Sequence, residues 1–275
     1  MQRRHFPAFL SALAITCAAL AASVAPLTAA AQQRIGVLML HGKNPGNNQD
    51  PNFKPLKASF EREGWLVSLP DMPWSRGRYL EGNWDKAMTE MAAHVKTLRD
   101  QGATKIVIVG HSLGSPAALS HAARGGDAGA LVLLAPGHIP LGYYTYPGLK
   151  VVHDSIDEAR ALVAAGKGDS RERFSDINQG KQQNVVTTAK DFLSYFDPTS
   201  DAEMSVTAPR VPATTAVMTV IGEKDPLFSR IKAYFVDKLP ANPKNKYLEV
   251  SGGHLETPRV ASEEVITWIK TALAD

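Results

Sequence analysis

A serine lies between two glycines in a pattern suited to nucleophilic catalysis. Residues 110–114 have the sequence Gly-His-Ser-Leu-Gly, which is G-x-S-x-G centred on Ser112. An apolar run, 105–109 (KIVIV), comes directly before it, and a segment with helix-forming residues follows. A strand–turn–helix setting of this kind holds a serine in a sharp turn with its hydroxyl accessible. We therefore predict that Ser112 is the nucleophile of an acyl-transfer reaction.

A serine hydroxyl is a weak nucleophile near neutral pH and needs a base that a third group orients. Where such groups follow successive strands of a parallel sheet, the chain order is serine, acid, histidine. His254 follows the last predicted strand and a Gly-Gly pair that lets the loop bend, so it is the predicted base. Asp225 is the predicted acid, with Glu223 as the alternative. Asp225 is preferred because Pro226 fixes its turn and can begin the next helix.

The oxyanion of acyl transfer needs two backbone N–H donors. One is predicted to be the amide of Leu113, the residue after the nucleophile. The other should come from the loop after the first strand, where Lys43 is the first choice and Gly42 the second. The Lys43 side chain is expected to be solvated and to lend only its amide, although attraction of an anionic substrate is the alternative.

Three further residues are candidate substrate contacts. His111 adjoins the nucleophile, where packing beside Ser112 is the main expectation. Trp74 lies in the loop after the second strand and is equally suited to substrate contact and to packing. Tyr143 belongs to a tyrosine-rich segment that could line an acyl pocket.

Apolar runs alternate with amphipathic segments along residues 32–275, which predicts parallel βαβ units. The fold class is therefore α/β: a doubly wound, mostly parallel six-stranded sheet with helices on both faces and an inserted cap. The predicted strands are residues 35–40, 65–69, 105–109, 130–134, 216–221 and 246–250. The predicted helices are residues 53–63, 84–101, 113–124, 227–239 and 260–273.

About 80 residues, 136–215, separate the fourth and fifth strands, which is far more than an ordinary connection. The segment leaves the carboxyl end of a strand, where ligands bind in such sheets. We therefore predict a cap over the site, with a solvated ornament as the alternative. Helices are expected at 155–165 and 185–196, and the polar run 166–183 between them is expected to be mobile.

Residues 1–31 are predicted to be a cleaved signal peptide, and a membrane anchor is the alternative. Arg3 and Arg4 precede an Ala- and Leu-rich stretch, and Ala29-Ala30-Ala31 offers a cleavage site. Arg3-Arg4-His5-Phe6 is similar to a twin-arginine motif, although an ordinary basic start is equally compatible. The predicted location is periplasmic or secreted.

Composition excludes several classes of protein. Of the 275 residues, 44% are hydrophobic and 21% are charged, which is ordinary for a globular protein. The net charge of +3 falls to +1 when Arg3 and Arg4 are removed, so a nucleic-acid partner is not expected. The single cysteine, Cys17, lies in the predicted signal, so we expect no disulfide and no cysteine-based metal site afterwards.

Four motifs, LMLHG, GHSLG, IGEKDP and GGH, occur on the predicted strand ends in an order that resembles the α/β-hydrolase superfamily. The resemblance extends over residues 34–275 and is closest in kind to exported bacterial hydrolases of unassigned substrate. It implies six parallel strands, a Ser112–His254–Asp225 triad and a cap. The chain begins at what would be the family's third strand.

The predicted function is that of a serine hydrolase that cleaves a carboxylic ester through an acyl-enzyme. A thioesterase, amidase or peptidase with the same triad is one alternative, and a non-catalytic binding protein on the same fold is another. No metal or organic cofactor is expected. The expected partner is a small-molecule ester, without nucleic acid and without a membrane span after signal cleavage, and the oligomeric state stays open.

Overall fold

The computed structural model describes residues 33–274, which belong to one compact unit. The predicted signal peptide, residues 1–31, lies outside the described residues, as does Cys17. No helix within the described range is long and apolar enough to cross a membrane.

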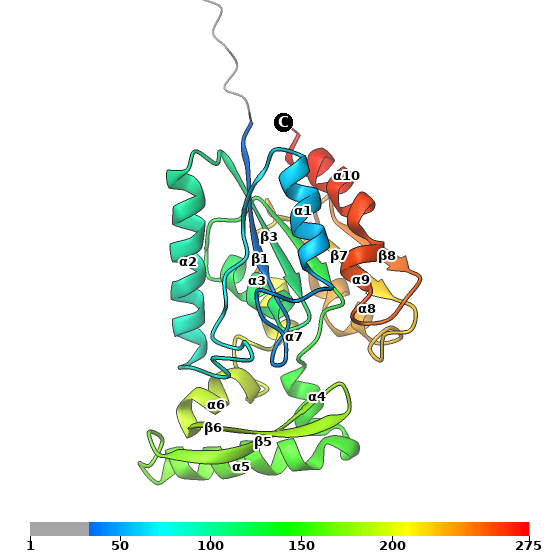
Figure 1. Cartoon of the computed structure of the whole chain (residues 1–275). Coiled ribbons are helices and arrows are strands. Elements are labelled where there is room, and N and C mark those ends of the chain that lie inside the picture. The colour runs from blue at the N-terminus through cyan, green and yellow to red at the C-terminus, as the bar shows by residue number, and fades with distance from the viewer. Residues whose placement is uncertain (1–32, 275) are drawn as a thin grey trace, which may run out of the picture. The chain divides into compact units, whose positions relative to one another are not determined.

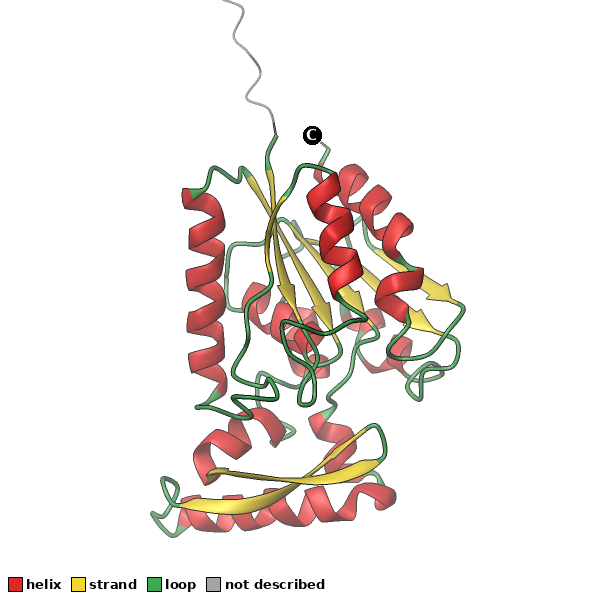
Figure 2. Cartoon of the chain, viewed as in Figure 1, coloured by secondary structure: helices red, strands yellow, loops and turns green. Residues whose placement is uncertain are grey.

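Six parallel strands form the central sheet, in the order β2-β1-β3-β4-β7-β8 (Figures 1 and 2). The strands are β1 (Ile35–Leu40), β2 (Leu66–Ser68), β3 (Lys105–His111), β4 (Ala130–Leu134), β7 (Ala216–Gly222) and β8 (Lys246–Val250). The four inner strands are buried along almost their whole length, as expected for apolar runs covered on both faces. The predicted six-stranded, doubly wound α/β fold is confirmed.

Helices cover both faces of this sheet (Figure 2). On one face lie α1 (Lys54–Arg62) and α10 (Ser262–Leu273), and on the other lie α2 (Trp84–Asp100) and α3 (Gly114–Ala123). Successive side chains of a strand point to opposite faces. Leu38 of β1 accordingly packs in the α2–α3 core, whereas Met39 packs in the α1–α10 core.

Two predicted helices near the C-terminus are divided in the structure. The segment predicted as a helix at 227–239 contains only α8 (Ile231–Tyr234) and a 3₁₀ turn, because Phe235 has φ of −142°, outside the helical range. Pro226 therefore lies in a turn and does not begin a long helix. The segment predicted at 260–273 is α10, preceded by α9 (Thr257–Val260).

Five elements between β4 and β7 form the cap, which Figure 1 shows beyond the carboxyl ends of the strands. They are α4 (Pro140–Thr145), α5 (Lys150–Ala164), β5 (Arg171–Asn178), β6 (Lys181–Thr188) and α6 (Ala189–Phe196). The short helix α7 (Met204–Thr207) follows them and packs against α3. Phe174 of β5 stacks on Phe192 of α6 with ring centroids 4.5 Å apart, and both belong to the apolar core that continues from the α2–α3 face of the sheet.

The cap corrects two expectations. The polar run predicted as a mobile segment at 166–183 holds strand β5 and the start of β6, which pair as an antiparallel hairpin. The helix predicted at 185–196 begins only at Ala189, because residues 185–188 complete β6. The helix predicted at 155–165 is α5, which begins earlier, at Lys150, and ends at Ala164.

Candidate active site

The turn between β3 and α3 presents Ser112 in a strained backbone conformation. Its φ is 52°, in the left-handed region, and its N–H donates to the carbonyl oxygen of Leu134 at 3.1 Å. A Cβ on Gly110 would lie 2.2 Å from the carbonyl oxygen of Gly114, and a Cβ on Gly114 would lie 2.2 Å from that of Leu40. The two glycines therefore allow α3 to begin this close to β1 and β3.

Ser112, His254 and Asp225 come together from the ends of β3, β8 and β7. The Oγ of Ser112 is 3.0 Å from Nε2 of His254, and Nδ1 of that ring is 2.7 Å from Oδ2 of Asp225. Asp225 is nearly buried, and its other oxygen accepts the N–H of Leu227 at 2.8 Å. With Nδ1–H donating to Asp225, Nε2 is free to accept the serine proton. The alternative acid, Glu223, is exposed and is not a partner of His254.

A second imidazole supports His254. Nε2–H of His111 donates to the backbone carbonyl oxygen of His254 at 3.0 Å, and the two rings lie 5.3 Å apart. Burial, followed by the charge of His254, lowers the pKa of His111 to about 4. His111 is therefore neutral near pH 7 and holds the histidine loop in place, in agreement with the expectation that it packs beside the nucleophile.

The loop after β1 lies against the nucleophile. A Cβ built on Gly42 would be 3.2 Å from Cβ of Ser112. Among residues 33–274, the backbone N–H groups of Gly42, Lys43 and Leu113 donate to no other group. Donors of this kind beside a serine are available to a developing oxyanion.

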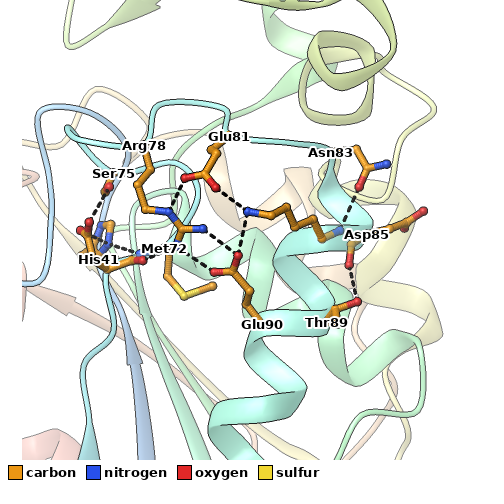
Figure 3. A network of polar contacts seen from close by, with 11 residues as sticks. His41, Met72, Ser75, Arg78, Glu81, Asn83, Asp85, Thr89 and Glu90 are labelled. Carbon is orange, nitrogen blue, oxygen red and sulfur yellow. Dashed lines mark hydrogen bonds and ion pairs between the residues drawn. The ribbon is translucent and has the colours of Figure 1, made fainter. Parts of the chain in front are cut away.

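Hydrogen bonds to the segment after β2 hold this loop. Nδ1–H of His41 donates to the carbonyl oxygen of Gly42 at 2.7 Å, and Nε2 accepts the N–H of Met72 at 3.1 Å (Figure 3). Nε1–H of Trp74 donates to the carbonyl oxygen of His41 at 2.9 Å, and the N–H of Asn44 donates to that of Trp74 at 2.9 Å. Trp74 is fully buried, so it packs under the loop.

The segment that carries Met72 and Trp74 is fixed in turn to α2. Arg78 donates to Glu90 at 2.7 and 2.9 Å, to Glu81 at 2.7 Å and to the carbonyl oxygen of Asp71 at 2.7 Å (Figure 3). A two-pronged guanidinium–carboxylate pair constrains orientation as well as distance. The segment that binds the loop beside Ser112 is therefore itself held in place by α2.

The Lys43 side chain corrects the expectation that it is solvated. Only 3% of it is exposed, and Nζ lies 2.5 Å from Oδ1 of Asp176 in β5. Nζ also donates to the hydroxyl of Tyr143 at 3.1 Å and to the carbonyl oxygen of Ile177 at 3.2 Å. Burial is tolerated because every ammonium proton has an acceptor supplied by the cap.

A cavity of about 400 Å³ opens at Ser112 and His254. His111 helps to line it, whereas the other two candidate substrate contacts, Trp74 and Tyr143, do not. Leu255 is its one large aliphatic residue. Most of the polar lining is not among the residues predicted from the sequence: Asn47, Gln49, Asp50, Asn52, Arg76, Asn178 and Gln179.

Two residues that the sequence did not indicate are informative: Arg76 in this lining and Gly137 beside Ser112. The exposed guanidinium of Arg76 has no hydrogen-bond or ion-pair partner in the described part of the chain. Gly137 donates its N–H to the carbonyl oxygen of Ser112 at 3.3 Å, and a Cβ there would be 2.9 Å from Oγ of Ser112 and 3.2 Å from Cε1 of His254. A single arginine and a single glycine carry no periodic signal by which the sequence could have revealed these roles.

No group of three or more His, Cys, Asp or Glu side chains within residues 33–274 is arranged to hold a metal ion. The chemistry that these residues can perform is proton transfer from a serine to an imidazole beside free backbone N–H donors.

A curated protein is similar in sequence over most of the chain. A curated protein of Dechloromonas aromatica (strain RCB), named 2-hydroxy-6-oxononadienedioate/2-hydroxy-6-oxononatrienedioate hydrolase 1, is 26% identical over 205 residues, which cover 70% of this chain and 71% of that protein.

Two solved structures are similar in fold. The monoacylglycerol lipase of Paleococcus ferrophilus superposes with a TM-score of 0.62 at 18% identity, over 86% of this chain and 94% of the other. Est1E from Butyrivibrio proteoclasticus superposes with a TM-score of 0.61 at 16% identity, over 88% of this chain and 89% of the other. The model of a protein family described as "Alpha/beta hydrolase family" matches residues 37–265, which is most of the chain. With its parallel sheet and its serine at the turn after β3, the chain belongs to the alpha/beta hydrolase family.

Proposed function

We propose that this hydrolase is a serine esterase that cleaves a carboxylic ester through an acyl-enzyme intermediate. The observation that carries the proposal is the continuous contact from Asp225 through His254 to Ser112, whose three members come from three strand ends. The strained φ of Ser112 also supports it, because strain of this kind persists where function requires it.

In the proposed reaction, Oγ of Ser112 attacks the ester carbonyl carbon while Nε2 of His254 takes the serine proton. Asp225 stabilises the imidazolium that forms. The N–H groups of Leu113 and of Lys43, or of Gly42, bind the oxyanion. The tetrahedral intermediate expels the alkoxide, which receives the proton from His254. Water then attacks the acyl-enzyme by the same route, releases the acid and restores Ser112.

The lining of the cavity favours a short, polar substrate. Side-chain amides from five residues interrupt its wall, whereas long acyl chains need continuous apolar walls. The unpaired guanidinium of Arg76 favours a substrate that carries a carboxylate, since Arg binds carboxylates through two parallel hydrogen bonds. The relative from Dechloromonas aromatica is named for dioate substrates, which fits the same preference.

Labelling with a fluorophosphonate probe tests the proposal. The probe should label the wild type and should not label Ser112→Ala. Hydrolysis of nitrophenyl esters of increasing acyl length then bounds the acyl group, and matched thioesters and amides test the two alternative bonds. Absence of labelling in folded protein would refute the esterase proposal and favour a binding role. Export by way of residues 1–31 is proposed with it, and cell fractionation tests it separately.

A further inference from the structure

One buried ion pair joins the loop beside the nucleophile to the cap. Lys43 stands in that loop and Asp176 in β5, and neither side chain is more than 3% exposed. The three acceptors of the Lys43 ammonium are the carboxylate of Asp176, the hydroxyl of Tyr143 and the carbonyl oxygen of Ile177. All three belong to the cap, so the side chain of Lys43 anchors its loop to that insertion.

Asp176 is connected further. Its second oxygen accepts a hydrogen bond from Tyr79 and another, at 2.8 Å, from Nε2 of Gln183 in β6. Gln183 in turn accepts a hydrogen bond from Nδ2 of Asn44 at 3.1 Å. Neighbouring residues 43 and 44 are thus both tied to the same hairpin, whose turn residues line the cavity.

Stability alone does not require charges at this position. A buried ion pair is costly to desolvate, and an apolar pair of similar volume is often as stable. The pair does orient the loop. Three hydrogen bonds fix the position of the Lys43 ammonium and so restrain the backbone around residue 43. That backbone includes the free N–H groups of Gly42 and Lys43, next to Ser112.

We propose that Lys43 and Asp176 are positioning residues that keep the oxyanion-binding amides of the β1 loop aligned with Ser112 only while the cap hairpin is seated. This inference rests on the proposed esterase function. It predicts that the cap contributes to the rate of acyl transfer, and not only to the shape of the substrate cavity. Tyr143 then acts as a partner of Lys43 and not as a substrate contact.

The double variant Lys43→Met/Asp176→Leu tests it. A methionine in place of Lys43 would keep the backbone N–H and fill similar space, so the fold should persist while the anchor is lost. Removal of one oxyanion donor lowers kcat by about 10²- to 10³-fold in enzymes of this type, and a misdirected donor should cost about 10- to 100-fold. KM should change by less than about threefold, because the buried side chains of Lys43 and Asp176 are not placed to contact the substrate.

Thermal unfolding and circular dichroism establish that the double variant is folded, and kcat and KM are measured on one short ester. Lys190→Met is the matched control, because it cuts an exposed cap ion pair with Asp169. A folded double variant with a wild-type kcat would overturn the inference. So would an equal loss of kcat in the control.

Gln183→Met decides the question if the double variant does not fold. It removes the hydrogen bond from the Asn44 side chain and one of those that Asp176 accepts. The Lys43–Asp176 contact stays, and so does the hydrogen bond from Asn178 to the carbonyl oxygen of Asn44. Loss of a hydrogen bond to the buried Asp176 carboxylate should lower the melting temperature. In protein that is still folded at the assay temperature, kcat should fall about threefold at constant KM, and an unchanged kcat would count against the anchor. Failure of the wild type to react with a fluorophosphonate would instead refute the esterase proposal, so the two failures are distinguishable.

Discussion

A methyl group at position 137 should separate the nucleophile from its base. The Cβ of an alanine there would be 2.9 Å from Oγ of Ser112, whereas ordinary contacts begin at 3.4 Å, so the overlap is about 0.5 Å. The serine side chain is the part that can yield, by turning about χ1. Such a turn would lengthen or break its 3.0 Å contact with Nε2 of His254.

The expected loss follows from the value of general-base catalysis. A positioned base contributes about 10²- to 10⁴-fold, and a displaced serine should lose at least the lower figure. We expect kcat/KM of Gly137→Ala to fall about 100-fold, which corresponds to about 2.7 kcal/mol of transition-state stabilisation. The stability of the fold should change by less than about 1 kcal/mol, because Gly137 does not need a positive φ and alanine restricts the unfolded chain.

The assay is steady-state hydrolysis of a short nitrophenyl ester, alongside thermal unfolding. Gly148→Ala is the control, since nothing lies within 4 Å of a Cβ at that position of the cap. A folded Gly137→Ala enzyme with the kcat/KM of the wild type would refute the reasoning. It would mean that the serine can turn without losing contact with His254, or that this contact does not limit the reaction.

Three further outcomes are expected. Gly114→Ala should lower the free energy of unfolding by about 1–3 kcal/mol in urea titrations, because its Cβ would meet backbone atoms of Leu40 that cannot turn away. Burial lowers the pKa of His111 to about 4 and that of His138 to about 3, so the unfolded chain takes up their protons first and stability falls as the pH drops below 6.5. Each contributes about 1.4 kcal/mol per pH unit over its range, and His138→Gln should flatten the melting temperature measured from pH 6.5 to 4. Arg76→Gln should raise KM about tenfold for a succinate half-ester and leave KM unchanged for the matched butyrate ester; equal effects on both would contradict carboxylate recognition.

The sheet and the three residues at its strand ends could be predicted because the information is local. A strand buried on both faces is a short apolar run, as in residues 35–40. The residues that form the turn after such a strand are adjacent in the sequence, so a catalytic motif there can be recognised directly. Gly-x-Ser-x-Gly, Asp-Pro and Gly-Gly-His each describe one turn. The positions of Ser112, Asp225 and His254 then follow from the rule that parallel strands end at one edge.

The cap hairpin could not be predicted, because one of its buried positions holds a charge. Phe174 and Asp176 both point into the cap core, but a carboxylate at the second position hides the alternation that marks a strand. Its partner, Lys43, is 133 residues away and looks like a surface lysine for the same reason. Each residue taken alone is predicted to be exposed to solvent. Only the ion pair between them explains why both are buried.

The loop beside Ser112 is held by two different kinds of contact. Toward the sheet it is held by neutral groups, His41 and Trp74, and toward the cap by the Lys43–Asp176 pair. Burial would raise the pKa of Asp176 and lower that of Lys43, but their mutual attraction reverses both shifts.

The folded pKa of Asp176 is therefore below its unfolded value and that of Lys43 is above it, so the stability from this pair is complete from about pH 4 to about pH 10. It is lost only as the pH falls through the folded pKa of Asp176 or rises through that of Lys43. A buried pair is also weakly screened by salt. The Lys43–Asp176 anchor should therefore be unchanged between pH 5 and 8, so a change in activity over this range must arise from other groups.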